Sequence, residues 1–180
     1  MVYFWGIIST AVIIFNVDTK LEVMIGERLQ ERGLSLAVAE SCTGGLIGHR
    51  LTNVSGSSIY YMGSITAYAY QVKVRLLKVK WETLEVHGAV SDETVGEMAL
   101  GVRQAMEADI GLSVSGIAGP TGGTPEKPVG LVYVGLSGPE GIWTTHRTFK
   151  GKRLQVKEQA SDFALNYLKD YLEGKLNGMD

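Results

Sequence analysis

The chain has 180 residues, of which 45% are apolar and 20% charged, and its formal net charge is −2. This length and balance predict one folded domain and exclude a disordered chain, and the even spread of Lys and Arg argues against a dedicated nucleic-acid binder. A single cysteine, Cys42, excludes an internal disulfide and favours a reducing, cytoplasmic location.

The first 17 residues stand apart because they are almost entirely apolar and contain no Lys or Arg. The run is slightly shorter than a membrane-spanning helix, which needs about 20 residues, and it lacks the basic region of a signal peptide. Three interpretations stay open: an extra structural segment, a mistaken translation start and, less favoured, a membrane anchor. We predict one domain over residues 18–175, preceded by a segment 1–17 of undefined role.

Hydrophobic periodicity predicts alternating helices and strands in the first half of the domain. Asp18 is the expected cap of a first helix, whose apolar residues recur at i, i+3 and i+4, and Gly33 is its expected end. The elements expected next are a buried strand at 34–39, a helix at 46–51, a loop at 53–58, a strand at 59–68 and a short helix at 73–77.

The second half contains one strong helix start at Ser91, which precedes an amphipathic run. The elements expected after it are a strand at 110–115, a Gly/Pro loop at 116–128, a hairpin of strands 129–136 and 142–149, and a closing helix at 154–171. Strands that alternate with helices predict an α/β fold, in which helices cover both faces of a mixed sheet. Ligands of such sheets bind beyond the carboxyl ends of the strands.

The turn Glu-Ser-Cys-Thr-Gly-Gly, which starts at Glu40, lies where an apolar strand gives way to a helix. Unpaired N–H groups at a helix start stabilise an anion or a developing oxyanion, and the two glycines allow close approach to the backbone. Ser41 or Cys42 is a candidate nucleophile, with Thr43 as a hydroxyl donor. Alternatively, Ser41 or Thr43 only caps the helix and Cys42 is a small buried apolar residue.

Two further segments have the composition of binding or catalytic sites. The loop from Ser115 to Pro128 is rich in glycine, and its N–H groups can form a concavity for phosphate or carboxylate, or it is only a rigid connection. Lys73 follows a predicted strand, where burial would lower its pKa and make it a base supported by Tyr68, unless it is simply solvated. The histidines have no ligand spacing, so we predict no metal site.

These segments, in this order, resemble the CinA C-terminal domain family over residues 19–172. The matching stretches are AESCTGG at 39–45, GSS at 56–58, AY…K at 67–73, HGAVS at 87–91, SGIAGPTGG at 115–123 and KPVG at 127–130. The resemblance implies a three-layer α/β/α sandwich with a mixed, mostly parallel sheet, and a homodimer.

Characterised members of that family are nicotinamide mononucleotide deamidases, which form nicotinate mononucleotide and ammonia without a metal. The resemblance thus implies a cytoplasmic amidohydrolase that takes a small pyridine mononucleotide and needs no cofactor. It implies that Ser41 is the nucleophile, that Lys73 is the base and that Tyr68 supports proton transfer. The residues that it implies for substrate binding are Thr43, Gly44, Gly45, Gly116, Gly119, Thr121, Gly122 and Gly123.

One stretch departs from the family pattern, which usually reads Tyr-Ser-Asn-Glu before its Val-Lys or Ala-Lys. This chain has Ala69, Tyr70 and Gln71 after Tyr68, so a hydroxyl and an amide are replaced by a methyl group and a phenol. The change motivates a rival hypothesis, a nucleotide-binding module without efficient chemistry. A second rival, a DNA-processing accessory protein, rests on the family label competence/damage-inducible protein, and the mild acidity counts against it.

Overall fold

A five-stranded sheet in the order β2-β1-β3-β4-β5 forms the middle of the computed structural model, which describes residues 20–176. β1 pairs in parallel with β2 and β3, whereas β3 with β4 and β4 with β5 pair antiparallel, so only β4 runs opposite to the others. The strands are β1 Leu36–Glu40, β2 Tyr61–Thr66, β3 Ile110–Gly116, β4 Leu131–Gly138 and β5 Gly141–Thr148.

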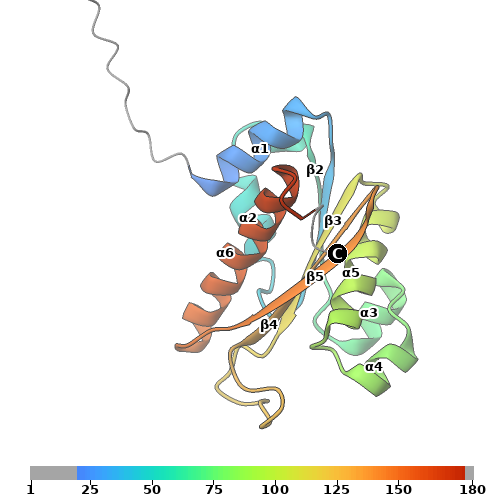
Figure 1. The fold of residues 1–180 in the computed structure, drawn as a ribbon, viewed down its shortest axis with the longest axis vertical. Helices are drawn as coiled ribbons and strands as arrows, with labels where there is room; N and C mark the ends of the chain where they lie inside the picture. Colours follow the sequence, from blue (N-terminus) through green and yellow to red (C-terminus); the bar gives the residue numbers. More distant parts are fainter. Residues whose placement is uncertain (1–19, 177–180) are drawn as a thin grey trace, which may run out of the picture.

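Helices cover both faces of this sheet (Figure 1). α1, α2 and α6 pack on one face, and α3, α4 and α5 on the other, which confirms the predicted three-layer α/β/α fold with a mixed sheet. Their bounds are α1 Leu21–Glu31, α2 Leu46–Thr52, α3 Tyr70–Leu77, α4 Trp81–His87, α5 Asp92–Ala105 and α6 Arg153–Leu172, with a 3₁₀ turn at Ser57–Ile59.

The central position of β1 explains its continuous apolar sequence. All five of its residues are buried, with Leu36 and Val38 in the core on the α1/α6 side and Ala37 and Ala39 in the core on the α5 side. A strand covered on both faces loses the usual apolar/polar alternation. On the α5 side the layers approach closely: a Cβ at Gly101 would lie 1.8 Å from the Leu77 carbonyl oxygen, so only glycine fits there.

Several predicted boundaries are confirmed and others shift. Ser91 caps α5, since its side chain accepts a hydrogen bond from the Thr94 N–H. The helix expected at 73–77 begins three residues earlier, at Tyr70. The sequence did not predict α4, because its seven residues carry too few apolar repeats to stand out. Asp18, the expected first cap, lies outside the described residues, and Lys20 occupies the N-cap of α1.

The apolar segment 1–17 also lies outside the described residues. Among residues 20–176, no helix combines the length and the apolar character that crossing a membrane requires.

Candidate active site

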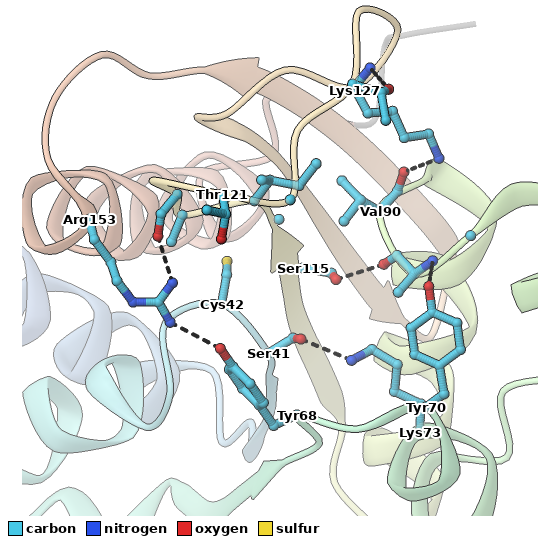
Figure 2. Close-up of a pocket in the computed structure, with 18 residues that line it drawn as sticks. Ser41, Cys42, Tyr68, Tyr70, Lys73, Val90, Ser115, Thr121, Lys127 and Arg153 are labelled. Carbon is cyan, nitrogen blue, oxygen red and sulfur yellow. Dashed lines mark hydrogen bonds between the residues drawn. The ribbon is translucent and has the colours of Figure 1, made fainter.

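The carboxyl ends of β1, β2 and β3 lie at one edge of the sheet, and the segments that leave them surround a cavity (Figure 2). The turn after β1 supplies Ser41, the connection after β2 supplies Tyr68, and the loop after β3 supplies a run of glycines. The cavity measures about 480 Å³, a size typical of small-molecule sites. Its position and size make it the candidate active site.

Ser41 and Lys73 meet inside this cavity (Figure 2). The Lys73 Nζ atom donates one hydrogen bond to Ser41 Oγ at 2.9 Å and another to the Ala67 carbonyl oxygen at 2.6 Å. Lys73 is only 1% exposed, because it shares the buried face of α3 with Leu77. The structure therefore brings the predicted nucleophile and the predicted base into direct contact.

Burial changes the ionisation of Lys73. Desolvation lowers the pKa of its ammonium group from 10.5 to about 8. Within the described part of the chain, no Asp or Glu side chain lines the cavity to supply a counter-charge. A lysine with this pKa has an appreciable neutral fraction near neutral pH, and its lone pair can accept the hydroxyl proton of Ser41.

Cys42, the other candidate nucleophile, lines the same cavity but is held in its unreactive form. Burial, above all, raises the pKa of its thiol from 9.0 to about 12. Because the thiolate is the nucleophilic form of cysteine, a thiol that stays protonated is a poor nucleophile. Between the two candidates, the geometry favours Ser41, whose hydroxyl has a base in contact.

The turn after β1 is organised by Glu40, a fully buried carboxylate whose importance the sequence did not show. Its two oxygens accept hydrogen bonds from Thr43 Oγ1 at 2.6 Å and from the N–H groups of Gly45, Ile47 and Gly48 at 2.9–3.2 Å. The N-terminus of α2 is thus occupied by an internal anion. This differs from the expectation that these donors face a substrate.

Three predicted binding residues lie away from the cavity lining, two of them because they bind Glu40. Thr43 is fully buried and donates to Glu40, and Gly45 gives its N–H to the same carboxylate. Gly44 is exposed, and a Cβ there would lie 3.6 Å from the Nζ atom of Lys157. The helix start predicted to cradle the substrate is instead the internal support of Ser41.

The glycine-rich loop after β3 meets the expectation better. Four of its predicted residues line the cavity, namely Gly116, Gly119, Thr121 and Gly122. The fifth, Gly123, packs against the Pro128–Val129 backbone, where a Cβ would lie 2.7 Å from the Val129 nitrogen. Within residues 20–176, the backbone N–H groups of Ala118 and Gly119, two residues that line the cavity, have no protein acceptor.

Tyr68 lies at the rim of the cavity and is 62% exposed. Its hydroxyl accepts a hydrogen bond from Arg153 Nη2 at 2.9 Å, rather than contacting Lys73 or Ser41. Arg153 also donates through Nη1 to the Gly119 carbonyl oxygen at 2.9 Å (Figure 2). Arg153, the first residue of α6, is a cavity residue that the sequence analysis missed, because nothing near it in the sequence marks it.

The opposite wall of the cavity is built by Tyr70, Ser115 and Lys127. Ser115 Oγ donates to the Ala89 carbonyl oxygen at 2.6 Å. Lys127 Nζ donates to the carbonyl oxygens of His87 and Val90, at 2.6 and 2.7 Å, and so fastens the glycine-rich loop to the segment before α5. The cavity is therefore lined by three cationic side chains, which are Lys73, Lys127 and Arg153.

Over the described residues, no group of three or more His, Cys, Asp or Glu side chains is placed to hold a metal ion.

Comparison with known proteins identifies the family. The profile described as CinA C-terminal domain matches residues 18–172. A CinA-like protein of Desulfosudis oleivorans is 56% identical over 126 residues, which are 70% of this chain and 30% of that protein. A CinA-like protein of Chloroherpeton thalassium is 48% identical over 159 residues, 86% of this chain and 38% of that protein. The chain therefore spans less than two fifths of the length of these relatives.

Solved structures agree with this assignment. A CinA superfamily protein from Klebsiella pneumoniae superimposes with a TM-score of 0.83 at 34% identity, covering 86% of this chain and 96% of that one. The competence/damage inducible protein CihA from Agrobacterium tumefaciens gives a TM-score of 0.81 at 36% identity, covering 85% and 93%. Sequence and fold lead to the same conclusion: the chain belongs to the CinA C-terminal domain family.

Proposed function

We propose that this protein hydrolyses the carboxamide of nicotinamide mononucleotide to nicotinate mononucleotide and ammonia. The observation that carries the proposal is the 2.9 Å contact between Lys73 Nζ and Ser41 Oγ inside the cavity. A serine hydroxyl is a weak nucleophile by itself and needs an adjacent base. The family assignment, whose extent is residues 18–172, is consistent with an amidohydrolase.

The cavity lining suits a ligand that carries a phosphate. Lys73, Lys127 and Arg153 line it, and among the described residues it contains no acidic side chain. Two of the five N–H donors of Arg153 are used by Gly119 and Tyr68, which leaves others for an anion. A cationic cavity of this size raises the local concentration of a small anionic substrate.

The proposed reaction proceeds through an acyl-enzyme. Neutral Lys73 takes the proton of Ser41 while the Ser41 oxygen bonds to the carboxamide carbon, and the N–H groups of Ala118 and Gly119 are candidates to stabilise the oxyanion. The C–N bond then breaks, and the departing nitrogen takes the proton from Lys73 and leaves as ammonia. Water attacks the ester and gives its proton to Lys73, which returns it to the Ser41 oxygen as the carboxylic acid is released and ionises.

The test is an ammonia-release assay with nicotinamide mononucleotide and no added metal. We expect turnover by the wild-type protein and its loss in Ser41→Ala, because the acyl-enzyme requires the Ser41 hydroxyl. Cys42→Ala is the matched control. Because the Cys42 thiol is protonated in the wild type, we expect its removal to lower the rate of ammonia release by no more than about tenfold. Undiminished turnover by Ser41→Ala would reject the proposal.

A second candidate, a nucleotide-binding module without turnover, is motivated by Ala69 and Tyr70. Ala69 gives α3 no side-chain cap, and Tyr70 places a phenol in the cavity where the family usually has an amide. This candidate predicts that nicotinamide mononucleotide raises the melting temperature while no ammonia appears. The homodimer and the cytoplasmic location remain predictions, which light scattering and cell fractionation can check.

A further inference from the structure

Tyr70 is a cavity-lining side chain with no part in the proposed Ser41–Lys73 chemistry. It is the first residue of α3, one helical turn before Lys73, so the two side chains lie on the same side of the helix. Its side chain lines the same cavity as Ser41 and is still 43% exposed. A large, partly exposed aromatic side chain in this cavity is available to contact a ligand (Figure 2).

The Tyr70 ring is held in place by groups of the surrounding protein. Trp81, at the start of α4, packs against it edge to face, with ring centroids 6.5 Å apart and an interplanar angle of 72°. Its hydroxyl accepts a long hydrogen bond from the Ala89 N–H at 3.4 Å. A ring fixed in this way contacts a ligand at little cost in side-chain entropy.

The charges around the cavity define what such a ring can recognise. The pyridine ring of an oxidised nicotinamide nucleotide carries a positive charge, whereas the cationic side chains of the lining suit only its phosphate. No carboxylate among the described lining residues can balance the ring charge. The electron-rich face of an aromatic side chain attracts cations, and the hydroxyl of Tyr68, the other aromatic residue of the lining, is already bound to the cationic Arg153.

We infer that Tyr70 binds the positively charged pyridinium ring through its aromatic face and selects oxidised over reduced nicotinamide mononucleotide. The inference rests on the proposed function, because it concerns the substrate of that site. Reduction makes the ring uncharged but leaves the ribose and phosphate unchanged, so the contribution of Tyr70 should vanish for the reduced form.

The test measures binding in the Ser41→Ala background by calorimetry, with oxidised and reduced nicotinamide mononucleotide as the two probes. In Tyr70→Leu, we expect affinity for the oxidised form to fall about 5- to 30-fold, the range of a partly desolvated cation–π contact. Affinity for the reduced form should change less than about twofold. Tyr70→Phe, which keeps the ring, is the matched control and should bind both forms about as the parent does.

Two results would overturn the inference: an equal loss for both probes in Tyr70→Leu, or a loss for the oxidised form in Tyr70→Phe as large as that in Tyr70→Leu. Failure of the proposed function is distinguishable, because it is measured separately as ammonia release by the protein with Ser41 intact. Oxidised-selective binding without ammonia would reject hydrolysis and support the role of Tyr70. Ammonia release by the protein with Ser41 intact, together with equal losses of affinity for the two probes in Tyr70→Leu, would support hydrolysis and reject the role of Tyr70.

Discussion

Glu40 and Lys73 are both buried at the carboxyl ends of the parallel strands, yet their surroundings differ. The Glu40 carboxylate accepts four hydrogen bonds, all from the turn and helix that follow it. The Lys73 ammonium has two acceptors, a hydroxyl and a carbonyl oxygen, and neither of them is charged. The Glu40 oxygens are thus fully hydrogen-bonded within the protein, whereas the Lys73 amine has only two uncharged acceptors.

The difference in hydrogen-bond partners gives the two buried side chains different properties. A buried carboxylate whose oxygens accept a full set of hydrogen bonds fixes the backbone around it. A buried charge with few partners is destabilised, and Lys73 responds with a pKa lowered to about 8. Glu40 therefore supports the shape of the site, whereas Lys73 is the group that we propose to react. Three measurements can break or sharpen this comparison, and a fourth tests another buried polar group.

The largest effect is expected for Lys73→Met, which keeps the length of the side chain and removes the amine. Loss of the activating base should lower kcat for ammonia release by at least about 10³-fold. Ser41→Ala in the same assay gives the reference for complete loss. A decrease of less than about tenfold would show that Lys73 is not the base.

The next largest effect is a dependence of stability on pH. Between pH 8 and 10.5 the unfolded chain holds a proton at residue 73 that the folded protein has lost, so the free energy of unfolding rises with pH. Relative to Lys73→Met, the wild type should gain about 3 kcal/mol across this window, measured by urea unfolding at each pH. The kcat/KM of the wild type should rise with pH and level off above about pH 8. Parallel stability curves for the two proteins would contradict the lowered pKa.

Glu40→Gln should act mainly on stability. The amide oxygen can replace Oε2, which accepts three of the bonds, but the amide nitrogen then turns its donors toward the Gly48 N–H that Oε1 accepted, so we expect a loss of about 2 kcal/mol in the free energy of unfolding. Glu97→Gln is the matched control, because the Glu97 carboxylate accepts only two such bonds and is partly exposed. Equal losses in the free energy of unfolding for Glu40→Gln and Glu97→Gln would show that Glu40 is no more important for stability than a partly exposed carboxylate.

The smallest effect is expected for Tyr60→Phe. The Tyr60 hydroxyl is buried and has no hydrogen-bond partner in the described chain, so its removal should leave the free energy of unfolding unchanged or raise it by up to about 1 kcal/mol. Tyr171→Phe is the control, since the Tyr171 hydroxyl donates to Glu140 and its loss should destabilise. A destabilised Tyr60→Phe protein would show that partnerless polar groups in this core are not simply unfavourable.

Local sequence patterns predicted most of the fold because they report burial and turns. The apolar run at 34–39 predicted β1, and Ser91 predicted the start of α5. The seven-residue α4 was missed, since a short helix with an exposed Trp81 lacks a clear apolar repeat.

The candidate site was only partly predictable from local patterns, because its contacts join segments that are distant in the sequence. The composition of the turn after β1 marked Ser41, but no spacing rule shows that Glu40 takes up the donors of Thr43 and Gly45. Arg153 joins the cavity through Tyr68 and Gly119, both far away in the sequence. Such contacts depend on how β2, β3 and α6 are arranged in space.

The position of Arg153 has a consequence for how the protein matures on the ribosome. The strands β1 and β3, which lead into Ser41 and the glycine-rich loop, are synthesised before α6, which carries the arginine that joins Tyr68 to Gly119. Domains are made from the N-terminus onward, so a nascent chain that stops before α6 has one face of its sheet covered only by α1 and α2, and its cavity lacks Arg153. The cavity should therefore be completed only when α6 docks on the sheet.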